Sequence, residues 1–289
     1  MSSCDAGKTK LCGIIGDPLE HTASPAMHNA AFRELGLDYL YAPFPVKEAE
    51  LGKTVTGMKA LNVRGFNVTL PHKVAIMRFL DKLDPLAENI GAVNTVVNKG
   101  GILTGYNTDA TGFLQALKEN GVEPAAKNMV IIGAGGAARA ISFILAQNEA
   151  SLTILNQQSE FDWARELAFR LSRLFQKAKA VVLNDKNLAS ALKGVDVLIN
   201  ATSVGMKPNQ KESPVPAKLL KRGLVVFDIV YNPPKTKLLK EAEAAGAKTI
   251  SGIDMLVWQG ALAFEMWTGQ KAPIELMKKE AIKALKHEN

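Results

Sequence analysis

The feature that most constrains the fold is a glycine-rich segment near the middle of the chain, residues 129–141. An apolar, β-prone run ends at Gly133, two further glycines follow, and the chain then becomes alanine-rich and helix-prone. This order predicts a buried strand, a tight turn and a helix whose first backbone N–H groups face a ligand. Gly133 would allow the turn, Gly135 would let a phosphate approach, and Ala138 would let helix and strand pack closely. The segment predicts a dinucleotide-binding βαβ unit, although a glycine-rich connection without a ligand would share the pattern.

Size and composition indicate a globular protein with two domains. The chain has 289 residues, of which 47% are hydrophobic and 22% charged, and domains average about 150 residues. No apolar run approaches the ~20 residues of a membrane span, and residues 1–10 lack the apolar core of a signal peptide. We therefore expect a cytoplasmic protein with no membrane partner. Cys4 and Cys12 are the only cysteines, and their spacing predicts neither a disulfide framework nor a metal site.

The net charge of +7 is compatible with an anionic ligand such as a carboxylate or a pyrophosphate. Nucleic acid is the alternative for a basic protein, but lysines and arginines are scattered over predicted helical faces. Their one cluster, residues 278–286, has the pattern of a solvated helix face. We therefore expect no nucleic-acid partner.

Two hydroxyls near the N-terminus form a candidate anion site. Ser24 followed by Pro25 is typical of a helix N-cap with proline at the first helical position, and Thr22 precedes it in the loop. Hydroxyls at the positive end of a helix suit a carboxylate. Ser24 would equally serve as the N-cap of its own helix, and both interpretations stay open on local grounds.

Four polar residues at predicted strand ends form a second candidate group: Thr69, Lys73, Asn94 and Asp109. Lys73 is expected to open a helix after a strand over residues 66–70, where a cation is electrostatically misplaced. Asn94 is expected inside an apolar strand, where a buried amide needs a partner. Asp109 is expected in a polar turn before a helix that starts near residue 113. Each residue alone has a structural explanation, so only the combination indicates a site.

Eight motifs resemble those of the shikimate dehydrogenase family and occur in the family's order. They are HTASP (21–25), NVTLPHK (67–73), GAVNT (91–95), NTD (107–109), GAGG (133–136), NATSVGM (200–206), YNPP (231–234) and MLVWQG (255–260). Together they span nearly the whole chain. Residues 236–269 are especially similar to the quinate/shikimate dehydrogenase subgroup. Thr22 stands where the family usually has serine, and its extra methyl group would narrow the pocket.

The resemblance implies an oxidoreductase of aromatic amino acid biosynthesis that reduces 3-dehydroshikimate to shikimate with a nicotinamide cofactor. Lys73 would be the catalytic acid–base, with Asp109 beside it. The implied substrate-binding residues are Thr22, Ser24, Thr69, Asn94, Asp109, Tyr231 and Gln259. The expected cofactor-binding residues are Gly133, Ala134, Gly135, Gly136, Ala137, Asn156, Gln157, Gln158, Thr202, Ile229 and Gly252.

The choice between NADP and NAD depends on residues 156–160, Asn-Gln-Gln-Ser-Glu, at the end of the next predicted strand. An acid there favours NAD and an arginine favours NADP. The NADP-using relatives carry arginines in this loop, whereas this chain has glutamines there and acids at Glu160 and Asp162. Family habit favours NADP and the chemistry of the loop favours NAD or dual use, so both stay open.

We therefore expect an α/β protein of two domains, with the active site in the cleft between them. Residues 1–109 plus 254–289 would bind the substrate, and residues 110–253 would form a Rossmann domain that binds NAD(P). The leading hypothesis is a shikimate dehydrogenase. The alternatives are a quinate/shikimate dehydrogenase using NAD and a catalytically silent NAD(P)-binding regulator; the paired hydroxyls disfavour a methylenetetrahydrofolate dehydrogenase. A homodimer is a candidate assembly.

Overall fold

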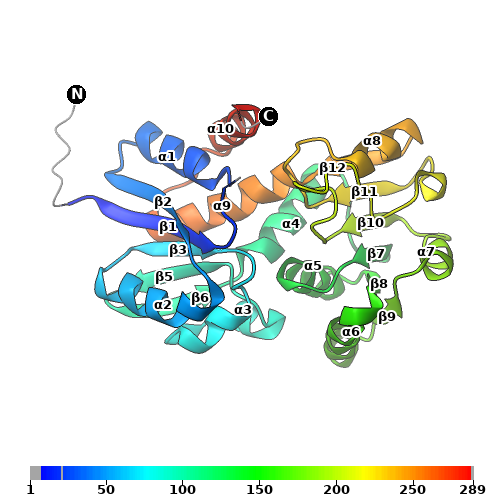
Figure 1. Ribbon diagram of the computed structural model, residues 1–289, viewed down its shortest axis with the longest axis horizontal. Helices are drawn as coiled ribbons and strands as arrows, with labels where there is room; N and C mark the ends of the chain where they lie inside the picture. Colours follow the sequence, from blue (N-terminus) through cyan, green and yellow to red (C-terminus); the bar gives the residue numbers. More distant parts are fainter. Residues whose placement is uncertain (1–7, 21, 288–289) are drawn as a thin grey trace. The chain divides into compact units, whose positions relative to one another are not determined.

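The computed structural model describes residues 8–20 and 22–287, and these residues form two compact α/β units (Figure 1). Unit 1 comprises Met1–Thr108 and Val257–Asn289, and unit 2 comprises Asp109–Leu256. The chain crosses between the units inside two helices, α4 (Thr108–Glu119) and α9 (Gly252–Thr268). Sequence reasoning placed these crossings after residues 109 and 253. No helix in the described part of the chain is both long and apolar enough to span a bilayer.

Unit 1 is built on a six-stranded mixed sheet in the order β2-β1-β3-β5-β6-β4. The strands are β1 (Lys10–Gly16), β2 (Tyr39–Pro45), β3 (Gly65–Val68), β4 (Lys82–Leu83), β5 (Thr95–Lys99) and β6 (Ile102–Tyr106). β1 pairs in parallel with β2 and β3, whereas β5 is antiparallel to both β3 and β6. The parallel strands β1, β2 and β3 therefore end at the same edge of the sheet. Thr69 and Lys73 lie in the segment that follows β3 at this edge.

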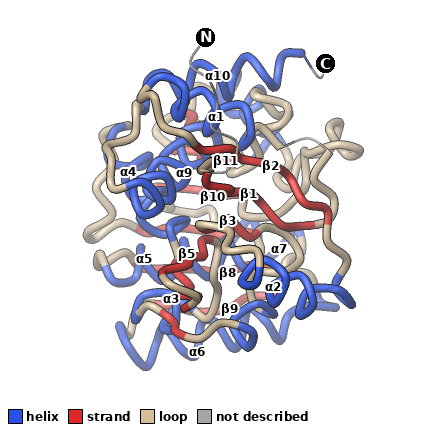
Figure 2. The backbone as a smooth tube through the Cα atoms, turned by 90° about the vertical axis from the view of Figure 1, so that its left-hand side faces the viewer, coloured by secondary structure: helices blue, strands red, loops and turns tan. Residues whose placement is uncertain are grey.

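Helices cover both faces of this sheet (Figures 1 and 2). The unit contains α1 (Ser24–Glu34), η1 (Glu48–Glu50), α2 (Leu51–Ala60), η2 (Ala75–Phe79), α3 (Pro85–Ile90), most of α9, and α10 (Ile274–His287). Phe66 of β3 packs with α2, η2 and α3 in one apolar cluster. The neighbouring Gly65 points to the other face, where a Cβ would collide with Trp267 of α9. That face holds an aromatic cluster of His28, Phe32, Tyr41, Phe264 and Trp267.

Unit 2 is a six-stranded parallel sheet in the order β12-β11-β10-β7-β8-β9. The strands are β7 (Asn128–Ile132), β8 (Ser151–Asn156), β9 (Ala178–Val182), β10 (Val197–Asn200), β11 (Val225–Asp228) and β12 (Lys248–Ser251). Strand order runs in opposite directions on the two sides of β7, so the reversal lies between β7 and β10. A dinucleotide binds at such a switch point, beyond the carboxyl ends of the strands.

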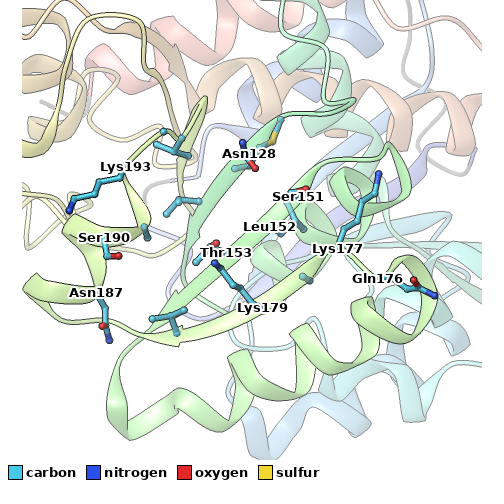
Figure 3. Close-up of a pocket in the computed structure, with 17 residues that line it drawn as sticks. Asn128, Ser151, Leu152, Thr153, Gln176, Lys177, Lys179, Asn187, Ser190 and Lys193 are labelled. Carbon is cyan, nitrogen blue, oxygen red and sulfur yellow. The ribbon is translucent and has the colours of Figure 1, made fainter.

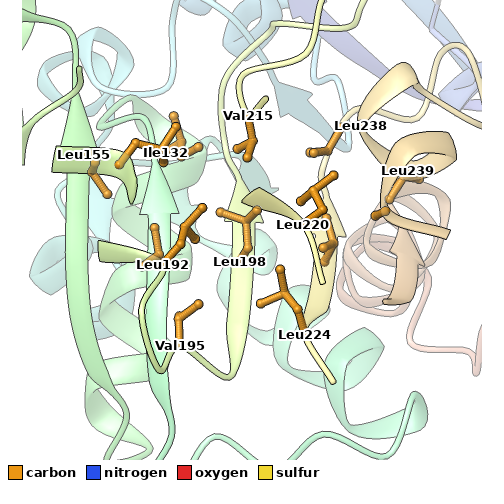
Figure 4. Packing of buried hydrophobic residues seen from close by; sticks show 14 residues of the cluster. Ile132, Leu155, Leu192, Val195, Leu198, Val215, Leu220, Leu224, Leu238 and Leu239 are labelled. Atoms are coloured by element: carbon orange, nitrogen blue, oxygen red, sulfur yellow. The ribbon is translucent and has the colours of Figure 1, made fainter. Parts of the chain in front are cut away.

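The helices of unit 2 lie on both faces of its sheet, as in a Rossmann fold. They are α4, α5 (Gly136–Gln147), η3 (Gln158–Glu160), α6 (Phe161–Phe175), α7 (Asp185–Ala191), η4 (Ala217–Leu219) and α8 (Lys237–Ala244). Leucines of α7 and α8 pack on Leu198 and Val226 in one buried cluster (Figure 4). The adjacent Phe227 points to the opposite face and stacks on Phe113 of α4, with ring centroids 4.5 Å apart. The predicted two-domain α/β architecture is therefore confirmed.

Several expected element boundaries were wrong. Ser24 is not an N-cap: it is the first residue of α1, because the preceding Ala23 has αR backbone angles and caps the helix without a side-chain bond. Asn94 precedes β5 instead of lying inside a strand. Lys73 lies in a turn, and the element after it is the five-residue 3₁₀ helix η2 rather than a helix opened by the lysine.

Candidate functional site

The glycine-rich loop joins β7 to α5 at the switch point of unit 2. Gly133 has φ +108°, and a Cβ there would lie 2.8 Å from the carbonyl oxygen of Ala201. This position therefore needs glycine for both conformation and space. Gly133 N–H donates to Leu155 O at 2.8 Å, which ties the turn to β8.

The N-terminus of α5 has the properties of an anion site. Gly135 is the N-cap, and no side chain of a described residue caps the helix. A Cβ built on Gly135 meets nothing within 4 Å, so the backbone there is open to a ligand. Gly136 and Ala137 form the first turn and are half-buried, whereas Ala134 is buried. Open backbone N–H groups at the positive end of a twelve-residue helix fit the pyrophosphate of a dinucleotide.

The loop after β8 is closed by its own first residue. Asn156 is buried and donates from Nδ2 to Glu160 O at 2.9 Å, so residues 157–160 form a compact turn. Gln157 and Gln158 are exposed on it. Arginines of the flanking helices are paired with acids: Arg139 lies 3.6 Å from Glu166, and Arg165 lies 3.0 Å from Asp162.

The remaining candidates of unit 2 follow β10, β11 and β12 at the carboxyl edge of the sheet. Thr202 donates from Oγ1 to Asn200 Oδ1 at 2.7 Å. Ile229 N–H donates to Asn200 O at 3.1 Å. A Cβ on Gly252 would collide with the Ile229 carbonyl, so glycine allows this close approach. Tyr231 is half-buried in the same loop as Ile229.

Asp109 occupies the first turn of α4, not a turn before the helix as expected. The helix starts five residues earlier than predicted, because the side chain of Asn94 accepts a hydrogen bond from Thr108 N–H at 2.7 Å. This bond satisfies a backbone donor at the helix start. Asp109 is consequently on a helix rather than on a loop, and it is buried.

In unit 1, two backbone bonds position Thr69 and Lys73. Thr69 N–H donates to Ile15 O at 2.9 Å, and Lys73 O accepts from Val93 N–H at 2.8 Å. Both side chains are half-buried. The turn that contains Lys73 is thus hydrogen-bonded to Val93, the residue before Asn94.

Thr22 and Ser24 lie together at the start of α1. Ser24 N–H donates to Thr22 Oγ1 at 3.3 Å, and Ser24 is buried while Thr22 is half-buried. Because Ser24 is not the N-cap, its hydroxyl is not used for the capping role that was the alternative to ligand binding. His21, the first residue of the HTASP motif, falls outside the described residues.

Asn94 is the centre of a buried hydrogen-bond network in unit 1. Its Nδ2 donates to Thr108 Oγ1 at 2.9 Å and to Gln259 Oε1 at 3.3 Å. Thr95 Oγ1 bonds Asn94 Oδ1 at 3.2 Å, and Asn67 Nδ2 donates to Thr95 Oγ1 at 3.1 Å. The structure thereby brings together Asn94 and Gln259, two predicted substrate residues separated by 165 positions.

Among the described residues, no group of three or more histidines, cysteines or acids could hold a metal ion. Unit 2 has a hollow of about 590 Å³ beside β7, β8 and β9, whose lining includes Lys177, Lys179 and Lys193 (Figure 3). Asn128 and Ser151 also line it, and they are the first residues of their strands. The hollow therefore lies toward the opposite strand ends from Gly133, away from the edge where dinucleotides bind.

Comparison with known proteins decides the family. A curated shikimate dehydrogenase (NADP(+)) from Dehalococcoides mccartyi is 49% identical over 276 residues, which cover 95% of this chain and 96% of that protein. The chain belongs to the shikimate dehydrogenase family. The model of the family's substrate-binding domain matches residues 14–96, and that of the shikimate 5′-dehydrogenase C-terminal domain matches residues 252–282. The predicted family is confirmed.

Two solved structures of the family extend the match to the fold. A shikimate dehydrogenase in complex with NADP+ is 46% identical, with a TM-score of 0.90 and coverage of 96% of both chains. The shikimate 5-dehydrogenase of Listeria monocytogenes, in complex with shikimate and NAD, is 44% identical, with a TM-score of 0.87. It covers 94% of this chain and 96% of its own.

Sequence reasoning missed the residues that hold the site residues in place. Asn67, Thr95 and Thr108 surround Asn94 in unit 1, and Asp228 bonds Asn200 in unit 2. A usable signal existed for Asp228, because an acid inside the apolar run of residues 224–230 requires hydrogen-bond partners.

Proposed function

We propose that this chain is a shikimate dehydrogenase that interconverts 3-dehydroshikimate and shikimate with NADP(H) or NAD(H). The observation that carries the proposal is the open N-terminus of α5 at the switch point of a Rossmann unit. In the same chain, unit 1 matches the family's substrate-binding domain. The 49% identity to a shikimate dehydrogenase (NADP(+)) supports the same reaction. These observations favour the dehydrogenase over a quinate-specific enzyme or a silent regulator.

Lys73 is the proposed acid–base. In the reductive direction a bound nicotinamide cofactor would supply the hydride for the carbonyl carbon, so that negative charge would develop on the carbonyl oxygen. The Lys73 ammonium stabilises that charge and donates its proton to the oxygen, which becomes the hydroxyl of shikimate. In the oxidative direction neutral Lys73 accepts the proton from the hydroxyl.

The substrate residues follow from the chemistry of a carboxylated ring that carries hydroxyl groups. Thr22 and Ser24 donate to the carboxylate at the N-terminus of α1, assisted by Tyr231. Thr69, Asn94, Asp109 and Gln259 hydrogen-bond the oxygens of the ring. The network around Asn94 fixes which way its amide points, since Asn94 Oδ1 accepts from Thr108 N–H. Because its orientation is fixed, the Asn94 amide presents its N–H donor and its oxygen acceptor at defined positions. It can therefore distinguish a substrate group that donates a hydrogen bond from one that accepts it.

The cofactor residues are proposed to act in three groups. Residues 133–137 bind the pyrophosphate through the backbone, and residues 156–158 contact the adenosine ribose. Thr202, Ile229 and Gly252 line the remainder of the site. NADP is supported by the curated relative, whereas a relative crystallised with shikimate and NAD and the exposed glutamines support use of NAD. A glutamine can hydrogen-bond a 2′-phosphate but cannot neutralise its charge.

Initial rates test the reaction with four pairs: shikimate or quinate, each with NADP+ or NAD+. We expect turnover on shikimate, with NADP+ at least as good as NAD+. Better rates on quinate with NAD+ would instead assign the chain to a quinate-oxidising role. Absence of turnover with every pair would refute the dehydrogenase and favour a regulator that only binds the cofactor.

Two alanine substitutions test the cofactor loop independently of turnover. Gly135→Ala adds a methyl group in open space, so we expect an unchanged thermal midpoint but an NADPH Kd raised by at least ~10-fold, because the methyl lies where the pyrophosphate approaches. Gly133→Ala is the contrasting variant: its φ of +108° should cost about 1–3 kcal/mol of stability. Equal NADPH affinity in Gly135→Ala and the unmodified protein would place the cofactor elsewhere.

Cytoplasmic location and a homodimeric assembly stay predictions. Cell fractionation checks the first. Light scattering at several concentrations checks the second.

A further inference from the structure

Asp228 is a buried carboxylate that has no role in the proposed chemistry. It is the last residue of β11 and has no solvent exposure. Three donors converge on its two oxygens. Thr236 Oγ1 donates to Oδ2 at 2.6 Å, while Asn200 Nδ2 and Val230 N–H donate to Oδ1 at 2.9 and 3.1 Å.

Two of the donors belong to the loop that follows β11. Val230 is near its start and Thr236 is at its end, so the carboxylate bridges the loop from within. Thr236 is also the N-cap of α8, since its Oγ1 accepts from Leu239 N–H at 3.3 Å. The conformation of residues 229–235, which include Ile229 and Tyr231, is therefore tied to one acceptor group.

The third donor belongs to the loop that follows β10. Asn200 is buried, and besides Asp228 its Nδ2 donates to Val204 O at 3.2 Å. Its Oδ1 accepts from Thr202 N–H at 3.1 Å and from Thr202 Oγ1 at 2.7 Å. The amide of Asn200 thus holds the loop that carries Thr202, and Asp228 holds the amide.

A carboxylate suits this position better than any neutral group of the same shape. Both oxygens of Asp228 act only as acceptors when ionised, and each receives at least one donor. An amide would present N–H to one of these donors and leave a buried group unsatisfied. Hydrogen bonds to an ionised acceptor are also stronger than those between neutral groups.

We propose that Asp228 is a positioning residue, which joins the loops after β10 and β11 and holds them in the conformation that binds the cofactor. This inference rests on the proposed function, because the loops are assigned to the cofactor there. Asp228 acts through Asn200 and Thr236 and does not touch the ligands itself. The competing explanation is that the network only stabilises the sheet edge.

The test uses three variants of the network and one control in the full chain. Asp228→Asn keeps the shape and removes the charge, Thr236→Val removes one donor, and Thr236→Ser retains the hydroxyl. Ser172→Ala is the matched control, because it removes a bond from Ser172 Oγ to Ala178 O of 2.6 Å in unit 2 at the start of β9. NADPH Kd by fluorescence titration, KM for NADP+ and shikimate, kcat and the thermal midpoint are measured for each.

We expect Asp228→Asn and Thr236→Val to raise the NADPH Kd and the NADP+ KM by about 10-fold. Thr236→Ser should restore both to within about twofold, and Ser172→Ala should change only the thermal midpoint. If Asp228→Asn fails to fold, Thr236→Val and Thr236→Ser test the proposal by the same two quantities, the NADPH Kd and the NADP+ KM.

The proposal is overturned if the network variants lower the thermal midpoint as Ser172→Ala does while the NADPH Kd stays unchanged. This failure is distinct from failure of the proposed function. An unmodified protein without turnover on any substrate pair refutes the dehydrogenase, whereas the NADPH titration still measures whether Asp228 positions the cofactor loops.

Discussion

Each unit has a buried polar network beside its candidate site residues, and the two networks are centred on different groups. The network of unit 1 is centred on the amide of Asn94, which bonds Thr95, Thr108 and Gln259. That of unit 2 is centred on the carboxylate of Asp228. An amide both donates and accepts, so it can distinguish the hydroxyls of a sugar-like ring from one another. A carboxylate only accepts, and it is suited to gathering backbone and side-chain donors from separate loops. We infer that the amide of Asn94 contacts the substrate, whereas the carboxylate of Asp228 positions the loops that are proposed to contact the cofactor.

The largest expected effect comes from Lys73, the proposed acid–base. Lys73→Ala should lower kcat by at least ~100-fold with little change in the KM for shikimate, because the proton donor acts in the transition state. Lys99→Ala is the control, since Lys99 is an exposed lysine at the end of β5. A Lys73→Ala enzyme within a few-fold of the unmodified rate would remove the lysine from the mechanism.

A charge placed at the position of Asn94 should destabilise unit 1. Asn94→Asp retains the acceptor for Thr108 N–H but replaces the donor that faces Gln259 Oε1 at 3.3 Å. Two acceptors then face each other without solvent, and we expect a loss of about 3 kcal/mol in the free energy of unfolding. Urea denaturation at pH 7.5 measures it.

The exposed Asn62→Asp serves as the control in the same unit and should be neutral. A stable Asn94→Asp variant would mean that unit 1 accommodates charge as unit 2 does. The proposed difference between the networks would then disappear.

Acidity should affect the two units in opposite directions. Burial lowers the pKa of His28 in unit 1 to about 3, and neither ring nitrogen has a hydrogen-bond partner among the described residues. The unfolded chain binds a proton near pH 6.5 and the folded chain does not, so His28 lowers stability by about 2 kcal/mol between pH 7.5 and 5. Burial raises the pKa of Asp228 to about 6, so the folded state takes up its proton first. Asp228 therefore opposes this loss by about 1 kcal/mol over the same range.

The variant His28→Leu separates these contributions. When the pH falls from 7.5 to 5, the unmodified protein should lose about 2 kcal/mol more in its free energy of unfolding than His28→Leu does. Asp228→Asn should shift this loss the other way, by about 1 kcal/mol. Identical pH profiles of His28→Leu and the unmodified protein would contradict a neutral, buried His28.

The smallest effect is expected at the periphery of the network around Asn94. Tyr41 Oη donates to Asn67 Oδ1 at 2.7 Å, and Asn67 in turn donates to Thr95. Tyr41→Phe should lower stability by about 1 kcal/mol and change the shikimate KM by less than ~2-fold. A 10-fold rise in KM would show that the whole chain of bonds, and not only Asn94, sets substrate affinity.

Much of the fold was predictable because local patterns and burial agree along unit 2. The segment around Gly133 predicted strand, turn and helix, and the structure has β7, the loop and α5 there. The predicted boundaries were wrong where a side chain from a distant part of the sequence determines where a helix or strand begins. The start of α4 depends on Asn94, fourteen positions earlier, and no local pattern contains that bond.

The positioning residues were missed for a related reason. Asn200 and Asp228 are 28 positions apart and meet only because β10 and β11 are neighbours in the sheet. Sequence reasoning identified residues whose type suggested ligand chemistry, such as Lys73, Thr22 and Ser24. An acid inside an apolar run, such as Asp228, indicates that hydrogen-bond partners are needed, but the sequence does not say which residues they are.

The division of the chain into units has a consequence for synthesis on the ribosome. Unit 2 is continuous, from Asp109 to Leu256, whereas unit 1 is interrupted and ends with Val257–Asn289. Trp267 is fully buried in unit 1 and donates from Nε1 to Val96 O at 3.0 Å. The part of unit 1 that is translated first thus lacks Phe264 and Trp267 of its aromatic cluster until α9 is made. Unit 2, although made later, can complete its own sheet before then.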